Sequence, residues 1–227
     1  MKPKICAVAF GENLEEIASI IREAEKLADL IEVRFDLSGE VDPEKIRRLT
    51  SLPLIATNRS KTEGGKFEGP AERQAELLLK AAEVGFEYVD LELSFKDLAK
   101  TVSKLKSFEV KLIISSHNFD ETPSIDRLRD ILRRQKESSA EICKIVTMAR
   151  SVEDNLAILS LLSSAAKSGE KIVAFCMGKL GLPSRILSPI FGGYFTYASI
   201  RRGREAAPGQ LTLEELRQIY RLMGFEG

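Results

Sequence analysis

The sequence predicts a (β/α)8 barrel, also called a TIM barrel, as a single domain over residues 1–227. Short apolar runs alternate with amphipathic stretches along the chain, which is the pattern of alternating strands and helices. The runs recur at intervals of about 23 to 35 residues, so each interval holds one strand–helix unit. Eight such runs are present, and eight units close a parallel sheet into a barrel.

Eight strands and the helices between them are predicted along the chain. Strands are expected where the runs are short, apolar and rich in strand-forming residues, at residues 5–10, 30–37, 54–58, 88–93, 111–117, 141–148, 171–177 and 194–199. Helical periodicity lies between the first seven strands, for example at residues 14–30, 71–84 and 154–168. The last connection, residues 178–193, has the composition of a loop.

Two tetrapeptides predict where helices begin. Ser151-Val-Glu-Asp154 and Thr212-Leu-Glu-Glu215 each place a hydroxyl residue three positions before a carboxylate. In such a capping box, both side chains accept backbone N–H groups that the first helical turn leaves free.

The main alternative to the barrel is an open doubly wound sheet. That fold commonly binds dinucleotides at a Gly-x-Gly-x-x-Gly turn after its first strand. The chain contains no such turn. The barrel is therefore favoured, and a dinucleotide cofactor is not supported.

Alternation within the strands separates an apolar face from a charged face, because successive side chains of a strand point to opposite sides. The second strand alternates Ile31, Val33 and Phe35 with Glu32, Arg34 and Asp36, and the fourth alternates Val89, Leu91 and Leu93 with Asp90, Glu92 and Ser94. In a barrel the apolar face packs on the helices. The charged groups then point into the lumen, where burial is tolerable only if they pair with one another or with a polar ligand. A polar pocket at the C-terminal strand ends is predicted.

Charge and composition restrict the class of partner. The chain has 34 basic and 34 acidic residues and a formal net charge of +0, so no global field attracts nucleic acid or an anionic membrane. A small-molecule substrate is expected.

No segment approaches the roughly 18 apolar residues that a membrane span needs. The apolar stretch at the N-terminus is too short for a signal peptide, so a cytoplasmic protein is expected. Cys6, Cys143 and Cys176 lie in apolar runs without metal-ligand spacing, which indicates buried reduced thiols and no metal site.

Lys144 and His117 are the candidate catalytic residues. Lys144 lies inside an apolar run from Ile142 to Val146, where neighbours on both sides favour burial over the solvated position usual for lysine. His117 is the only histidine and ends the apolar run that starts at Leu112. A lone histidine is more often structural. On the strand next to a buried lysine it becomes a candidate acid/base, because a lysine can form an imine with a ketone while a histidine moves protons.

The residues alone allow two interpretations for each of three further features. Glu63, after the third strand, either orients His117 or belongs to an ordinary surface loop. Arg185 has the fork geometry to clamp a carboxylate, although an arginine on a helix surface is the commoner case. Residues 203–210 form either a lid over the site or a plain loop.

The last observation is a set of six motifs: Glu32-Val-Arg34-Phe-Asp36, Arg59-x3-Glu63-Gly-Gly, Ser116-His117-Asn118, Lys144, Met177-Gly-x2-Gly-x2-Ser-Arg185 and Ala207-Pro-Gly-Gln210. Each is weak alone, but together they are specific. The set resembles the type I 3-dehydroquinate dehydratase family of the shikimate pathway. The resemblance covers nearly the whole chain, from the first strand to Gln210.

The resemblance implies a cofactor-free lyase of aromatic amino-acid biosynthesis that removes water from 3-dehydroquinate to give 3-dehydroshikimate. Lys144 matches the lysine that forms a Schiff base with the substrate ketone. His117 matches the general acid/base, and Glu63 matches the carboxylate that pairs with it. The family is commonly dimeric, so a homodimer is implied. Nothing resembles the fused shikimate dehydrogenase domain of some relatives, so a monofunctional enzyme is expected.

The resemblance also implies the binding residues: Glu32, Arg34 and Arg59 for the substrate hydroxyls, Arg185 and Gln210 for its carboxylate, Phe175 and Met177 against its ring, and Asp90 as a support below the site. The chain departs from the family at one position. Many relatives have Ser-Ala-Pro-Gly-Gln in the closing loop, whereas this chain has Ala206 in place of the serine. One hydrogen bond from the lid to the substrate is therefore absent or supplied by another group.

Two other functions fit part of these observations. A class I aldolase-like barrel also uses an imine-forming lysine but cleaves a carbon–carbon bond; the pairing of His117 with Glu63, and Arg185, favour dehydration instead. A non-catalytic barrel that binds a polyhydroxy acid as a sensor has no need for a reactive lysine in its lumen. Chemical trapping of Lys144 separates the sensor from an enzyme.

Overall fold

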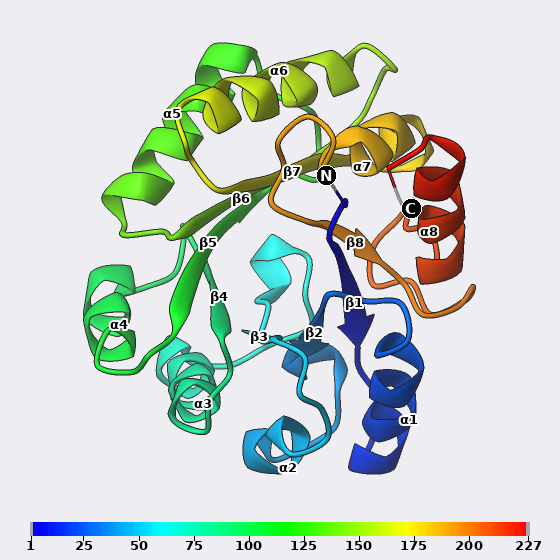
Figure 1. Ribbon diagram of the computed structural model, residues 1–227. Helices are drawn as coiled ribbons and strands as arrows, with labels where there is room; N and C mark the ends of the chain where they lie inside the picture. The colour runs from blue at the N-terminus through cyan, green and yellow to red at the C-terminus, as the bar shows by residue number, and fades with distance from the viewer. Residues whose placement is uncertain (1, 226–227) are drawn as a thin grey trace.

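Eight parallel strands curl into a barrel, and the helices lie outside it (Figure 1). The structure is a computed structural model and describes residues 2–225. The strands pair in the order β7-β6-β5-β4-β3-β2-β1-β8. Their bounds are β1 Ile5–Ala9, β2 Leu30–Arg34, β3 Leu54–Thr57, β4 Tyr88–Glu92, β5 Lys111–His117, β6 Ile142–Met148, β7 Ile172–Met177 and β8 Thr196–Ala198.

The barrel closes between β7 and the residues just before β8. The Tyr194 N–H donates to the Ile172 carbonyl at 2.7 Å, and the Thr196 N–H donates to the Lys4 carbonyl at 3.0 Å, which leads into pairing of β8 with β1. Within the described residues, β7 and β8 are not paired as strands beyond this contact. The barrel is therefore nearly closed. The predicted TIM-barrel fold is confirmed.

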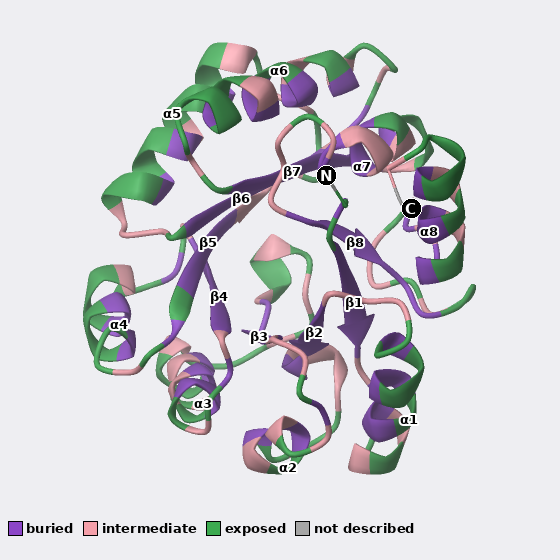
Figure 2. Ribbon diagram, in the orientation of Figure 1, coloured by how far each residue is buried: buried purple, intermediate pink, exposed green. Residues whose placement is uncertain are grey.

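The helices form the outer layer of the barrel. Their bounds are α1 Leu14–Ala24, α2 Pro43–Arg47, α3 Ala71–Glu83, α4 Leu98–Leu105, α5 Ile125–Glu137, α6 Asp154–Lys167, α7 Leu182–Leu187 and α8 Leu213–Leu222, with short 3₁₀ helices at Phe35–Leu37, Lys61–Glu63 and Lys179–Gly181. Figure 2 shows the strands buried throughout most of their length and the helices buried on the side that faces them. Each helix therefore covers the outer, apolar face of the sheet.

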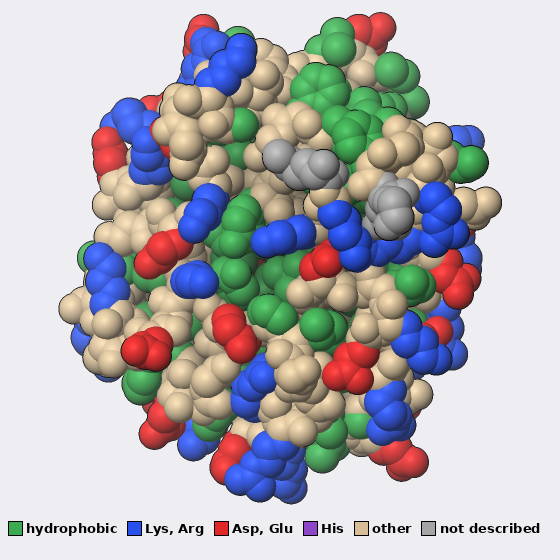
Figure 3. Space-filling model, in the orientation of Figure 1, with side chains coloured by type: hydrophobic (Ala, Val, Ile, Leu, Met, Phe, Trp, Pro, Cys, Tyr) green, Lys and Arg blue, Asp and Glu red, His purple; other side chains and the backbone are tan. Residues whose placement is uncertain are grey.

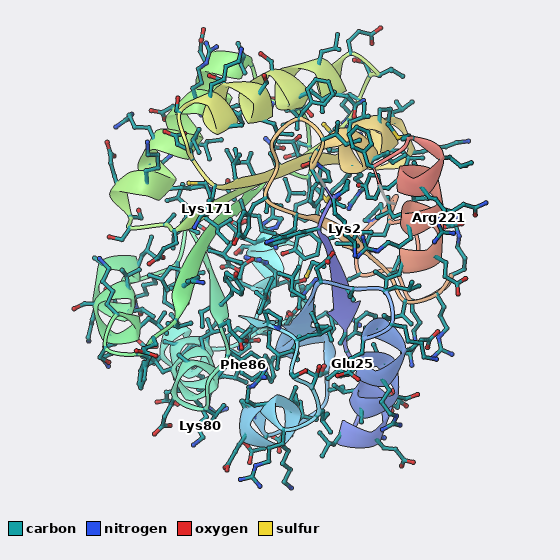
Figure 4. All side chains as sticks on the ribbon, viewed as in Figure 1. Lys2, Glu25, Lys80, Phe86, Lys171 and Arg221 are labelled. Atoms are coloured by element: carbon teal, nitrogen blue, oxygen red, sulfur yellow. The ribbon has the colours of Figure 1, made fainter. Side chains whose placement is uncertain are left out.

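The hydrophobic core has an outer part and a luminal part. Ile31, Val33 and Val89 belong to the cluster between strands and helices, as the alternation predicted. A separate cluster fills the lumen, and Figure 4 shows side chains crowding the space inside the ring of strands. Its members include Ile55 and Ile113, each two residues before a polar luminal residue, Thr57 and Ser115, on the same strand. On β3 and β5 the luminal side chains therefore change from apolar to polar toward the C-terminal strand end.

Two predicted elements end earlier than expected. The strand predicted over residues 30–37 stops at Arg34, because Phe35–Leu37 turns into a 3₁₀ helix. The Asp36 carboxylate stabilises this turn by accepting the Arg34 guanidinium and the backbone N–H of Arg59. The helix predicted over residues 14–30 ends at Ala24, since the chain must turn back for β2 to pair with β1.

Two predictions about helix starts and loops are wrong. Residues 178–193 are not a plain loop, because they contain a 3₁₀ turn and helix α7, whose first turn holds a proline that is preorganised for helix entry. Ser151 does not form a capping box. Helix α6 begins only at Asp154, whose carboxylate accepts the Ser151 N–H at 2.9 Å while the Ser151 side chain caps nothing among the described contacts.

The second predicted capping box is confirmed at the start of α8. The Thr212 hydroxyl accepts the Glu215 N–H at 3.3 Å, and the Glu215 carboxylate accepts the Thr212 N–H at 2.8 Å. We expect Thr212→Ala to lower the free energy of unfolding by about 1 kcal/mol, because one N–H of the first turn loses its acceptor. Urea denaturation measures the change. Ser160→Ala, at an exposed position inside α6, is the matched control and should cost nothing measurable.

The surface agrees with the balanced composition. On the face seen in Figure 3, lysine and arginine side chains lie interspersed with aspartate and glutamate. In the described part of the chain, no helix is both long and apolar enough to cross a membrane. Cys6, Cys143 and Cys176 are buried free thiols there, as predicted.

Candidate active site

One pocket lies at the C-terminal ends of the barrel strands. It gathers every residue that the sequence analysis assigned to catalysis or binding except Asp90, which lies beneath it. Its lining includes Glu32, Arg34, Arg59, Glu63, His117, Lys144, Phe175, Met177, Arg185, Tyr197 and Gln210. Strand alternation explains the convergence of the strand residues among them, because every second residue of each strand points inward. Arg59, Glu63, Arg185 and Gln210 reach the pocket from segments that follow the strands.

Lys144 occupies the middle of β6 and is only 4% exposed. Its Nζ lies 2.8 Å from Asp90 Oδ2, 2.9 Å from the Tyr197 hydroxyl and 3.2 Å from Glu32 Oε1. The three contacts take up the three N–H groups of an ammonium. Two carboxylates therefore hold a buried positive charge at this point of the lumen, which satisfies the requirement that a buried charge be paired.

Asp90 supports the pocket from below. Its carboxylate contacts Lys144, accepts the Ser115 hydroxyl at 2.6 Å, and pairs with Arg59 Nη2 at 2.8 Å. Burial alone would raise the pKa of Asp90, but the Arg59 and Lys144 cations outweigh it and hold that pKa well below its usual range. Asp90 is therefore a permanent anion that fixes both cations in position.

His117 and Glu63 form a second pair at the rim. His117 Nδ1 lies 2.9 Å from Glu63 Oε2, which also accepts the His117 backbone N–H at 2.9 Å. The other Glu63 oxygen, Oε1, accepts the Ser94 hydroxyl at 2.7 Å. A carboxylate at Nδ1 keeps the proton on that nitrogen, so Nε2 carries the free lone pair of the neutral ring.

The electrostatic environment keeps His117 neutral. Burial, together with the cations of Arg59 and Lys144, lowers the pKa of His117 well below its ordinary value. Burial also raises the pKa of Glu63. At neutral pH the imidazole is therefore unprotonated and can accept a proton, and the adjacent carboxylate stabilises the imidazolium that results.

Arg185 is a buried cation with unused donors. It projects from α7 and is 2% exposed, contrary to the helix-surface position that is commoner for arginine. Its Nη2 donates to the Pro208 carbonyl at 3.2 Å, whereas Nε and Nη1 have no hydrogen-bond partner within residues 2–225. Burial lowers the pKa of Arg185 to about 10, so it stays charged at neutral pH. The guanidinium lies 4.3 Å from the Phe175 ring centroid. A buried guanidinium with free donors on a pocket wall suits a carboxylate ligand.

Residues 203–210 cover one side of the pocket. Ala206, Ala207 and Pro208 line it, and the Gln210 side chain accepts the Ala206 N–H at 2.9 Å. This segment packs closely on the end of β7, since a Cβ at Gly209 would lie 2.6 Å from the Gly178 carbonyl oxygen. Glycine is needed there for this approach and for its positive φ of 78°.

Comparison with known proteins identifies the family of this chain. A model of the family "Type I 3-dehydroquinase" matches residues 5–226. The chain belongs to the type I 3-dehydroquinase family. A relative in Dehalococcoides mccartyi named 3-dehydroquinate dehydratase is 38% identical over 224 residues, covering 99% of this chain and 97% of the relative.

Solved structures of 3-dehydroquinate dehydratases have the same fold. The Geobacillus kaustophilus protein superposes with a TM-score of 0.91 at 26% identity, covering 100% of this chain and 93% of that one. The type I protein of Clostridium difficile, solved with covalent modified comenic acid, gives a TM-score of 0.85 at 29% identity, covering 98% and 92%.

Within this type I 3-dehydroquinase fold, the sequence analysis missed three pocket residues, Phe119, Val146 and Tyr197. Of these, Tyr197 is the one that contacts Lys144. Its hydroxyl contacts Lys144, and it also lies 3.1 Å from Glu32 Oε1. The available signal was its alternation with Thr196 and Ala198 on a short strand, which puts Tyr197 on the same face as Phe195. Among residues 2–225, no group of three or more His, Cys, Asp or Glu side chains is placed to hold a metal ion.

Proposed function

We propose that this protein removes water from 3-dehydroquinate to give 3-dehydroshikimate, a step of the shikimate pathway, with Lys144 as the imine-forming residue and His117 as the general acid/base. One observation carries the proposal: a buried lysine and a histidine–carboxylate pair open onto the same pocket. The names of the relatives, which are 3-dehydroquinate dehydratases, support it.

Lys144 supplies the electron sink. Its amine adds to the substrate ketone, and loss of water leaves an iminium that withdraws electrons from the adjacent carbon. The positive charge stays between Glu32 and Asp90, which already pair with the ammonium. The site is therefore organised for a cation at this position both before and after the imine forms. Covalent modified comenic acid in the Clostridium difficile relative agrees with covalent chemistry in this family.

His117 moves the proton. Register pairs Ser115 with Lys144 and His117 with Val146, so His117 lies two residues, or about 7 Å of strand, beyond the lysine toward the pocket mouth. A substrate joined to Lys144 then lies between the two residues. Neutral His117 removes the proton next to the iminium carbon, and the imidazolium, stabilised by Glu63, returns it to the leaving hydroxyl. Hydrolysis of the imine releases the product.

The remaining lining residues bind the substrate. The free Nε and Nη1 donors of Arg185 would hold its carboxylate under residues 206–210. Glu32, Arg34 and Arg59 would bind hydroxyls, while Phe175 and Met177 present apolar surface to the ring. Arg34 is itself fixed by two hydrogen bonds to Asp36, at 2.9 and 2.8 Å, so its position is set before substrate binds.

Borohydride reduction in the presence of 3-dehydroquinate tests this function. We expect peptide mass spectrometry to find the reduced adduct on Lys144, because the iminium is the only bond between substrate and protein that borohydride reduces. Without borohydride, the reaction should release the conjugated enone 3-dehydroshikimate. Lys179, an exposed lysine, is the internal control and should stay unmodified.

The other outcomes separate the alternatives. Tight binding without any adduct would indicate a non-catalytic sensor. An adduct accompanied by carbon–carbon cleavage products would indicate an aldolase-type reaction. Either result would overturn the dehydratase assignment.

A further inference from the structure

Tyr197 carries a hydroxyl where packing alone would accept phenylalanine. The side chain is 3% exposed and lies edge-on to Phe175 and Phe195, with ring centroids 6.0 and 5.3 Å away. A phenylalanine ring would fill the same space. Burying the extra hydroxyl costs free energy unless it is hydrogen-bonded. Its two partners are Lys144 and Glu32, both of which line the pocket.

The direction of both hydrogen bonds follows from chemistry. A protonated lysine can only donate, and an ionised carboxylate can only accept. At 2.9 Å from Lys144 Nζ and 3.1 Å from Glu32 Oε1, the hydroxyl therefore accepts from the lysine and donates to the glutamate. Burial, followed by the charge of Glu32, raises the pKa of Tyr197 well above its ordinary value, so the phenol keeps its proton.

The two carboxylates beside Lys144 differ in their neighbours. Asp90 is held by Arg59 and Ser115 as well as by Lys144, and the strong pairing with two cations makes it a weak base. Within the described residues Glu32 forms no direct ion pair with an arginine, and its other hydrogen-bond partners are the hydroxyls of Thr57 and Tyr197. Its direct contact with Lys144 is 3.2 Å, longer than either hydrogen bond through Tyr197.

We infer that Tyr197 is a further catalytic residue, which relays a proton between Lys144 and Glu32 while the imine forms and hydrolyses. The inference rests on the proposed function of Lys144. In the first step the ammonium gives one proton to the Tyr197 oxygen as the phenol proton passes to Glu32. This leaves a neutral amine, an intact phenol and a neutral Glu32 acid.

The protons balance over the whole sequence. The amine lone pair forms the C–N bond with the ketone carbon, and one nitrogen proton moves to the former carbonyl oxygen to give the carbinolamine. Glu32 then returns its proton to the carbinolamine hydroxyl, which leaves as water while the nitrogen lone pair forms the C=N bond. The products are the iminium, one water and the Glu32 carboxylate, and imine hydrolysis runs through the same steps in reverse.

Tyr197→Phe tests the relay, because it removes the hydroxyl and keeps the ring. The rate of imine formation is measured in a single turnover with 3-dehydroquinate, by quenching with borohydride at successive times and quantifying the Lys144 adduct. We expect this rate to fall by about 10²-fold, the effect of losing one general acid–base group. We also expect a larger change in kcat than in KM. A packing defect would instead weaken substrate binding and imine formation together.

Tyr194→Phe is the matched control. It removes a tyrosine hydroxyl from the opposite end of the barrel, where the partner is Tyr88, and should leave the rate of imine formation unchanged. In the unmodified protein, rates in mixtures of light and heavy water should curve with deuterium content, because two protons move together. This second measurement applies even where Tyr197→Phe fails to fold.

The outcomes are distinct. If the unmodified protein forms no adduct on Lys144, the proposed function fails and the relay fails with it. If it does form the adduct, but Tyr197→Phe forms it equally fast or the heavy-water dependence is linear, the relay is overturned and the proposed function stands.

Discussion

Lys144→Ala is expected to abolish turnover of 3-dehydroquinate, with kcat reduced by about 10⁴-fold or more, as for loss of a covalent nucleophile elsewhere. Among residues 2–225, Lys144 is the only lysine that lines the pocket, so no other side chain described there can form the iminium that acidifies the adjacent carbon. Steady-state assays of product release measure the effect. Substantial residual turnover would remove the imine mechanism.

The alanine variant also disturbs the fold, so a second variant is needed. Removing the ammonium leaves Glu32 and Asp90 buried without the cation between them, and losing one partner of a buried ion pair costs about 3–5 kcal/mol. Lys144→Arg keeps a cation, but a guanidinium does not form the imine. We expect this variant to stay closer to the parent in a urea denaturation and to remain inactive, which separates lost chemistry from lost stability.

His117→Ala is expected to slow elimination by about 10³-fold while the imine still forms, because this residue moves the proton and Lys144 makes the covalent bond. Borohydride should therefore trap the substrate on Lys144 in this variant at close to the parent level. Measuring kcat and the trapped fraction together tests the division of roles. Turnover at the parent rate would show that another group is the base.

Added imidazole provides a control for the histidine variant. If the lost function is proton transfer, free imidazole in the vacated space should restore part of kcat without changing the trapped fraction. His117 is the only histidine in the chain, so diethyl pyrocarbonate can modify no other imidazole in the unmodified protein. Loss of activity in parallel with that single modification, and protection by substrate, would agree with the same role.

Local sequence patterns predicted the fold class, and the family motifs named most members of the site. Strand periodicity placed Lys144 and His117 on neighbouring inward faces, and the structure brings both to one pocket. This works because inward direction in a strand depends only on the parity of the position. The same local rule located the capping box at Thr212, since all its hydrogen bonds lie within four residues.

The pairing of groups across the barrel could not be predicted from local sequence. The sequence did not reveal that Arg185 is buried with free donors, because residues 178–193 read as a loop and their burial depends on packing against β7 and β8. It also did not single out Tyr197, 53 positions from Lys144 in sequence. Contacts between distant strands depend on how the sheet closes. On a three-residue strand, an inward tyrosine that only packs in the core has the same local sequence pattern as one that takes part in the reaction. Closure of the barrel brings its hydroxyl to the lysine, which no local sequence rule encodes.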